Sequence, residues 1–201
     1  SFYASLALFG DEVTDRAPFP SYYWTRIGYI APVGVLTAIF GAFPGFLAYK
    51  FLLTAAISVS AYLIARRHTQ PWIAAWLTAA IITSSVVLSY LGNPYLTGSV
   101  LAGTSILIAL GTATEPSRIS AILAGIAMGW VAMVNPPGAL LAGTLWLVLV
   151  LNNGASSDGL SRMQTLLFAL PGFFIVVAAF VIIGTAVFPS ENWISTYTSA
   201  L

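Results

Sequence analysis

The residues best suited to chemistry lie in one polar, aromatic-rich stretch near the start of the chain, "FGDEVTDRAPFPSYYWTRIG" (residues 9–28). It holds three of the six acidic residues, Asp11, Glu12 and Asp15, and two of the seven basic ones. A carboxylate can take a proton from a hydroxyl group or hold a divalent cation. These three acids are therefore candidate catalytic residues. The alternative is a solvated connector, because loops concentrate polar residues with or without a function.

Arg26 carries a permanent charge directly before a long apolar run that begins "IGYIAPV". A guanidinium presents a planar fork of donors that fits a phosphate or pyrophosphate group. The competing interpretation is an arginine that anchors a helix end at a membrane interface. Tyr22 and Tyr23, shortly before Arg26, are candidates for the wall of the same cavity.

Few other residues suggest chemistry. Asn93, in "YLGNPYLTG", could donate hydrogen bonds into a cavity, although Asn-Pro also ends a helix. Lys50 is interpreted as an anchor and His68 as a loop residue. The sequence contains no Ser-His-Asp set, P-loop, zinc-ligand spacing or dinucleotide fingerprint. No cofactor is required by a motif, and a divalent cation held by the acids is the one metal considered.

Composition assigns the chain to a membrane. Of its 201 residues, 59% are hydrophobic and 6% are charged, whereas a soluble domain carries about a quarter charged residues. The mean hydropathy is +0.92. The predicted fold class is an all-α, polytopic transmembrane helix bundle. A net charge of +1 gives no reason to expect nucleic acid, and the absence of cysteine excludes disulfides and thiolate chemistry.

Six apolar runs approach the roughly 20 residues that a spanning helix needs. They cover 46–65, 72–91, 96–112, 119–134, 138–151 and 165–188. Pro and Gly in the breaks between them end helices, and the break "NPP" fits either a tight hairpin or a kink. A shorter apolar stretch, 27–43, is interrupted by Pro32 and is predicted to be a juxtamembrane or re-entrant helix.

These runs predict three regions. An outer juxtamembrane loop with short helices covers 1–43, a transmembrane bundle of about six spans covers 44–188, and an outer loop begins over 189–201. We expect the sequence to be a fragment that lacks residues before Ser1 and after Leu201.

The arginines predict the orientation. Four of them fall in alternate breaks, which must share one side of the membrane: Arg66, Arg67, Arg118 and Arg162. That side is cytoplasmic by the positive-inside rule. The polar stretch 9–28 then faces outward, and the expected location is a multi-pass protein of the plasma membrane with its active face outside.

Two stretches resemble a known family. "TRIGYIAPVGVLTAIFGAFPGFLAYKFLLTAAISVSAYLIARR" (25–67) and "GIAMGWVAMVNPPGALL" (125–141) are similar to membrane glycosyltransferases of the GT-C type, which use polyprenyl-phosphate sugars, such as protein mannosyltransferases and aminoarabinose transferases. The order of the runs fits from Thr25 to about Phe188.

The resemblance implies a helical bundle with juxtamembrane helices in its first outer loop. It implies transfer of a sugar from a polyprenyl-phosphate donor to an acceptor glycan, lipid or protein on the outer face. In this family an acidic residue at the start of that loop acts as the base, and basic residues hold the donor phosphate. Arg26 matches such a basic residue. The base is expected upstream of Ser1, which would make Asp11 and Glu12 secondary acids.

Two further functions stay open. A multi-span transporter or lipid-handling permease fits the many Gly- and Pro-rich runs, although ionisable residues are missing from the centres of the predicted spans. A membrane subunit without catalysis of its own would lack a cavity beside the polar stretch. The sugar, the acceptor and the oligomeric state are not predicted.

Overall fold

The computed structural model describes residues 26–92, 96–152 and 160–187, and this part of the chain is entirely helical. Its helices are α4 (Ile27–Phe40), α5 (Ala42–Arg66), α6 (Pro71–Ile82), α7 (Ser85–Gly92), α8 (Thr97–Gly111), α9 (Arg118–Val134), α10 (Pro136–Asn152) and α11 (Arg162–Val187). The predicted all-α class is confirmed for these residues. The expectations for 1–25, 93–95 and 188–201 lie outside them.

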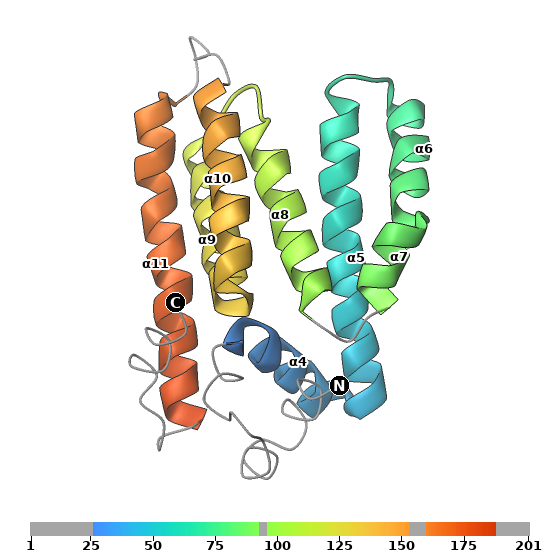
Figure 1. Ribbon diagram of the computed structural model, residues 1–201, viewed down its shortest axis with the longest axis vertical. Helices are drawn as coiled ribbons and strands as arrows, with labels where there is room; N and C mark the ends of the chain where they lie inside the picture. Colours follow the sequence, from blue (N-terminus) through green and yellow to red (C-terminus); the bar gives the residue numbers. More distant parts are fainter. Residues whose placement is uncertain (1–25, 93–95, 153–159, 188–201) are drawn as a thin grey trace.

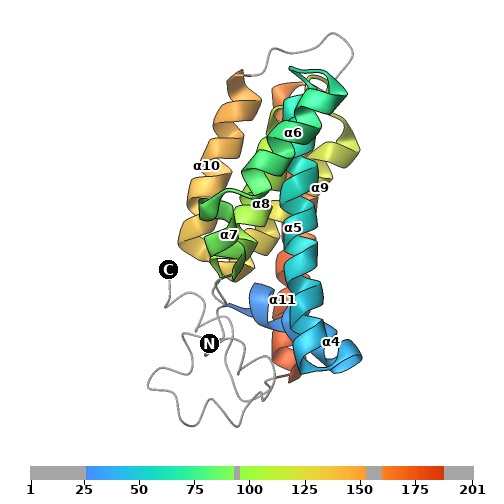
Figure 2. The same cartoon turned by 90° about the vertical axis from the view of Figure 1, so that its right-hand side faces the viewer.

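The long helices alternate in direction along the bundle, and α4 lies across one end of it (Figure 1). The connections α5–α6 and α8–α9 lie at the opposite end, as do the starts of α9 and α11. The same arrangement is seen from the side, where α4 again lies beside the first turns of α5 (Figure 2). The bundle therefore has two distinct ends, one covered by α4 and one formed by the starts of α9 and α11.

Two helices of the described chain, α5 and α11, are long and apolar enough to cross a membrane. The pair α6 and α7 passes the same test together but is bent by 60°, as in a broken span or a re-entrant loop. The remaining apolar helices, α4, α8, α9 and α10, have 14–17 residues. The described part of the chain thus has two or three candidate spans, where the sequence predicted about six. Each of the six predicted runs does form a helix, except that the run 72–91 forms two, α6 and α7.

The run 72–91 is the one that the sequence did not divide. Its break lies at Thr83 and Ser84, whose hydroxyl groups donate to the carbonyls of Ala79 and Ile81 at 2.8 and 2.7 Å. Such side-chain bonds compete with the helical hydrogen bonds. The Ser84 hydroxyl also accepts the N–H of Val87 at 3.4 Å, within the first turn of α7. A hydroxyl pair therefore ends one helix and begins the next.

Small residues allow α9 and α11 to pack closely. A Cβ added at Gly129 would lie 2.9 Å from the carbonyl oxygen of Phe173, and one at Gly125 would collide with the carbonyl oxygen of Ala169. Gly172 faces the main chain of Ile122 in the same way. Small residues at such spacing are how helices approach one another in membranes.

The break "NPP" is a tight hairpin. Asn135 follows the last residue of α9 in an extended conformation, and α10 begins at Pro136. The two helices then run in opposite directions side by side (Figure 1). Gly41, with a φ of +86°, makes the corresponding joint between α4 and α5, a conformation that glycine adopts without steric cost.

Candidate functional site

Arg26 lies directly before α4 and is buried, with 7% of its surface exposed. Its Nη1 donates to the carbonyl oxygen of Val134 at 3.4 Å and to Oδ1 of Asn135 at 3.3 Å. Val134 is the last residue of α9, and Asn135 is its C-cap. The last carbonyls of a helix carry partial negative charge, so a cation is favourable there. Arg26 therefore attaches the start of α4 to the end of α9.

Two further contacts hold the same joint. Trp130 Nε1 donates to the carbonyl oxygen of Gly28 at 2.9 Å. A Cβ added at Gly28 would lie 2.7 Å from the carbonyl carbon of Met133, so only a glycine lets α4 approach α9 this closely. We call this joint, formed by Arg26, Gly28, Trp130, Val134 and Asn135, the α4–α9 junction.

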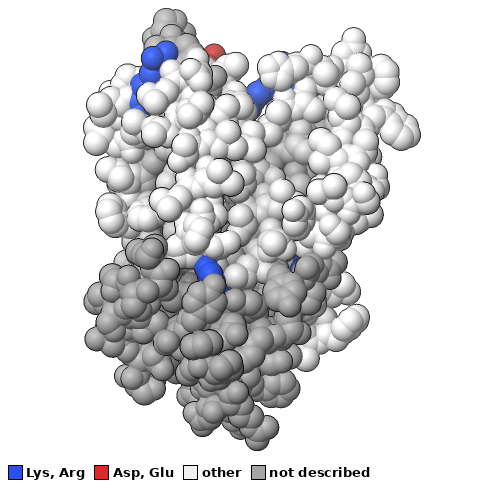
Figure 3. All heavy atoms as spheres, viewed as in Figure 1, with Lys and Arg blue, Asp and Glu red and all other residues white. Residues whose placement is uncertain are grey.

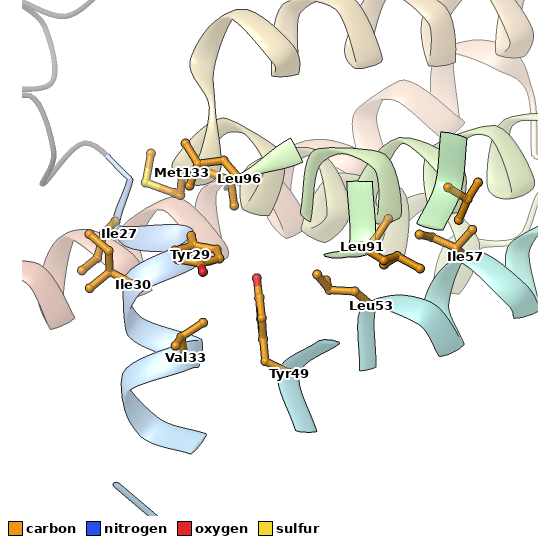
Figure 4. Packing of buried hydrophobic residues seen from close by; sticks show 13 residues of the cluster. Ile27, Tyr29, Ile30, Val33, Tyr49, Leu53, Ile57, Leu91, Leu96 and Met133 are labelled. Carbon is orange, nitrogen blue, oxygen red and sulfur yellow. The ribbon is translucent and has the colours of Figure 1, made fainter. Parts of the chain in front are cut away.

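A buried hydroxyl cluster lies beside the junction. The rings of Tyr29 and Tyr49 meet edge to face with centroids 5.6 Å apart, and Figure 4 shows the two side chains pointing toward one another between α4 and α5. The Tyr49 hydroxyl and Ser99 Oγ form a hydrogen bond of 2.8 Å. Burial raises the pKa of Tyr29, which lies outside the candidate spans, to about 12. This phenol is therefore neutral at physiological pH.

An apolar groove opens next to this cluster. It has a volume of about 510 Å³ and lies between α4, α5, α9 and α11. Its walls include Pro32, Leu36, Leu53, Trp130 and Phe180. The groove begins five residues along α4 from Arg26, an axial rise of about 8 Å at 1.5 Å per residue. A positive charge and an apolar groove thus lie close together at the end of the bundle covered by α4.

A second apolar groove, of about 490 Å³, lies between α9, α10 and α11. Ala132, Leu140 and Phe173 are among its walls. Arg26 lines neither groove, whereas Tyr49 and Trp130 line the first and Thr144 lines the second. Both grooves are therefore almost entirely apolar.

Arg66, Arg67, Arg118 and Arg162 lie at the other end of the bundle. They stand at the end of α5 and at the starts of α9 and α11, which lie at the same end of the bundle in Figure 1. In Figure 3 basic atoms appear at this end and again beside the undescribed region, and the flank between them is uncharged on the face shown. The four arginines thus lie at one end of the bundle, and that this end faces one side of a membrane stays a prediction.

Only part of the predicted site falls within the described residues. Asp11, Glu12, Asp15, Tyr22, Tyr23 and Asn93 lie outside them, so their roles stay predictions. Among the described residues no group of three or more His, Asp or Glu side chains could hold a metal ion. The divalent cation considered for the three acids is not tested, because these acids lie outside the described residues.

For Arg26 the structure gives one function directly, which is fixing a helix end. Phosphate binding stays a prediction. Sequence reasoning missed the partners of this arginine and the hydroxyl cluster. Tyr49 and Ser99 did carry a signal, since a polar side chain inside an apolar run needs a hydrogen-bonding partner from another helix. No family model, curated protein or solved structure matches the chain.

Proposed function

We propose that this chain is part of an integral membrane glycosyltransferase of the GT-C type, which transfers a sugar from a polyprenyl-phosphate donor to an acceptor at the end of the bundle covered by α4. The observation that supports this proposal is the position of Arg26, a buried cation about 8 Å along α4 from an apolar groove. A lipid-linked sugar phosphate has the same two parts, a charged group and an apolar chain.

The chemistry suits this arrangement. The acceptor forms a bond to the anomeric carbon as the bond from that carbon to the phosphate oxygen breaks, and the electron pair leaves with the phosphate. A guanidinium stabilises the negative charge that develops on the leaving group. A carboxylate takes the proton of the acceptor hydroxyl. Asp11, Glu12, Asp15 or an acid before Ser1 would supply that carboxylate.

The contacts of the α4–α9 junction support a fixed position for the charge. Nη1 of Arg26 is directed at Val134 and Asn135, and these contacts hold one end of the guanidinium. Catalytic stabilisation of charge is most effective when the donors are already oriented before the reaction. The same contacts also make Arg26 a structural residue, so a test of its function has to separate the two effects.

The proposal includes an orientation. The six helical runs cross the plasma membrane, with α6 and α7 as one bent span. The helices α8, α9 and α10 are shorter than a bilayer is thick, and local thinning of the bilayer or snorkelling of the residues that flank them accommodates the difference. The end that carries Arg66, Arg67, Arg118 and Arg162 is cytoplasmic. The end covered by α4 is outside, where α4 is a juxtamembrane helix.

Sugar transfer by the full-length protein from a panel of polyprenyl-phosphate sugars tests the proposal. Loss of one charge-stabilising donor typically lowers kcat by 10²–10³-fold, so we expect Arg26→Ala to lower transfer by about 100-fold. Arg26→Lys, which keeps the charge, should recover part of it. Arg66→Ala is the matched control, because Arg66 is an exposed arginine whose Nη1 contacts its own loop at Thr69. Undiminished transfer by a folded Arg26→Ala protein would refute the phosphate role.

One observation favours a second candidate, a lipid-handling permease. The 60° break between α6 and α7 resembles the discontinuous helices of transporters. This candidate predicts substrate movement across reconstituted vesicles without sugar transfer. It also predicts that a straightened α6–α7 pair, obtained with Thr83→Ala and Ser84→Ala together, abolishes that movement.

A further inference from the structure

We propose that the end of the bundle opposite α4 binds the headgroups of anionic phospholipids. The binding groups are the four arginines at that end, Arg66, Arg67, Arg118 and Arg162, which we call the arginine rim. This inference concerns a different end of the molecule from the proposed sugar-transfer site and does not depend on it.

Contacts between helices fix the helix ends that carry the arginine rim. Arg67 Nη1 donates to Thr112 Oγ1, which links the end of α5 to the end of α8. The guanidinium carbon of Arg118 lies 5.2 Å from the ring centroid of Phe168 on α11. The N–H of Leu160, just before α11, donates to the carbonyl oxygen of Pro116 at 3.1 Å. The end of α5 is thus fastened to the end of α8, and the start of α9 to the start of α11.

Three of the four side chains are presented outward. Arg66, Arg118 and Arg162 are exposed, whereas Arg67 is half-buried. Arg118 is supported by the aromatic ring beneath it, which orients a guanidinium with little loss of its donors. The exposed arginines are therefore the groups that would meet a headgroup, and Arg67 is the one that joins helices.

The starts of α9 and α11 do not provide the binding groups themselves. Ser117 and Ser120 form a reciprocal capping box at the start of α9. At the start of α11, Ser161 N–H donates to Gln164 Oε1 at 2.9 Å, and Gln164 N–H donates to Ser161 Oγ at 3.3 Å. Both helices therefore satisfy N-terminal donors with their own side chains, and the attraction for an anion comes from the guanidinium groups.

The charge balance at this end is positive. The connections beside the arginine rim contain two acids in the sequence, Glu115 and Asp158, of which Asp158 lies outside the described residues. Four positive charges against two negative ones leave a net charge of +2. A surface of this sign attracts anionic lipids, with roughly 1 kcal/mol, or about fivefold in binding, for each arginine near the membrane surface.

Exposed apolar side chains lie next to the arginine rim in the sequence. Ile119 follows Arg118, Met163 follows Arg162, and Trp72 is the second residue of α6, after the α5–α6 connection. Their exposed fractions are 71%, 65% and 62%. Charge above an apolar layer matches a phospholipid, which places its phosphate above its acyl chains. A soluble acidic protein or a nucleic acid could contact the arginines but has no acyl chains to pack against the apolar side chains.

The test uses the full-length protein in mild detergent, with phosphatidylglycerol or phosphatidylcholine added in equal amounts. Retained lipid is measured by native mass spectrometry. We expect the parent protein to retain phosphatidylglycerol preferentially and to lose the preference as salt is raised. The triple variant Arg66→Gln, Arg118→Gln, Arg162→Gln should retain it about 100-fold less, from about fivefold for each arginine removed. Arg118→Gln alone should show an intermediate loss of retained phosphatidylglycerol. This single variant replaces the triple variant as the test if the triple variant does not fold.

Lys50→Gln is the matched control, because it removes one positive charge from α5 far from the arginine rim. It should keep the lipid preference of the parent protein. Equal retention of the two lipids by the parent would overturn the inference. So would a triple variant that still prefers phosphatidylglycerol, or an equal loss in Lys50→Gln.

Discussion

At the scale of single residues, Arg26 shows how one side chain can serve a fold and a proposed reaction together. Its guanidinium contacts Val134 and Asn135 at the end of α9. In a bundle with so few charges, a buried cation at a helix C-terminus is favourable by its interaction with the helix dipole. The same contacts fix the charge where a lipid phosphate would meet it. Asn135 is therefore the residue whose change best reveals how firmly Arg26 is held.

Replacing Asn135 by alanine removes an acceptor from a buried guanidinium. A hydrogen bond to a charged group contributes roughly 1.5–3 kcal/mol, so we expect Asn135→Ala to lower the free energy of unfolding by about 2 kcal/mol. Asn135→Asp keeps an acceptor and should recover most of the loss. Thermal unfolding in detergent measures both. Asn152→Ala, at the exposed end of α10, is the control and should leave the midpoint unchanged. An Asn135→Ala protein as stable as the parent would contradict this role.

At the scale of helices, the sequence predicts positions well where Gly and Pro interrupt apolar runs. The run 96–112 extends one residue beyond α8 at each end, and the run 119–134 begins one residue after the start of α9 and ends with it at Val134, before Asn135. The bend between α6 and α7 escaped prediction because Thr83 and Ser84 lie inside an apolar run, and their hydroxyl bonds depend on the folded backbone. Helix ends at Gly and Pro can therefore be predicted from sequence, whereas competition between side-chain and helical hydrogen bonds cannot.

The site was less predictable than the helices. Arg26 is identified from its charge, its place before an apolar run and the family resemblance, but its partner Asn135 is 109 residues away, and no pattern within one sequence connects the two. Tyr49 and Ser99 come from different helices in the same way. Packing of distant helices decides such pairs. The acids Asp11, Glu12 and Asp15 were singled out by composition, and their position relative to Arg26 stays a prediction.

The packing of α9 against α11 gives a prediction at this scale. A methyl group at Gly129 would lie 2.9 Å from a main-chain oxygen of Phe173 and 3.1 Å from Cβ of Val176. Overpacking costs about 1–3 kcal/mol, more than the roughly 1 kcal/mol that alanine gains over glycine in a helix. Gly129→Ala should therefore lower the unfolding midpoint. Gly143→Ala is the control, because its methyl group would lie at an ordinary 3.5 Å from Met128 Sδ. Equal midpoints for the two variants would contradict close packing at Gly129.

At the scale of the whole molecule, the two ends of the bundle carry different groups. One end combines α4, the buried Arg26 and an apolar groove. The other carries the arginine rim. A membrane would separate these ends, and the positive-inside rule then assigns the arginine rim to the cytoplasm. The sequence contains no cysteine, so single cysteines can report the side on which each end lies.

We expect Ala42→Cys, exposed at the start of α5, to react with a membrane-impermeant thiol reagent in intact cells. Glu115→Cys, exposed between α8 and α9, should react only after the cells are permeabilised. Labelling of the permeabilised cells is the control that both thiols are accessible. The reverse pattern in intact cells would place the end covered by α4 inside and would refute the proposed orientation.

Binding of a polyprenyl phosphate to the full-length protein in lipid nanodiscs tests the proposed donor site without knowledge of the sugar or the acceptor. We expect saturable binding that Arg26→Ala weakens by about tenfold, because a charged hydrogen bond is lost. His68→Ala, at an exposed loop position outside the arginine rim, should leave this binding intact. Equal binding by the parent protein, Arg26→Ala and His68→Ala would contradict the proposed phosphate role of Arg26.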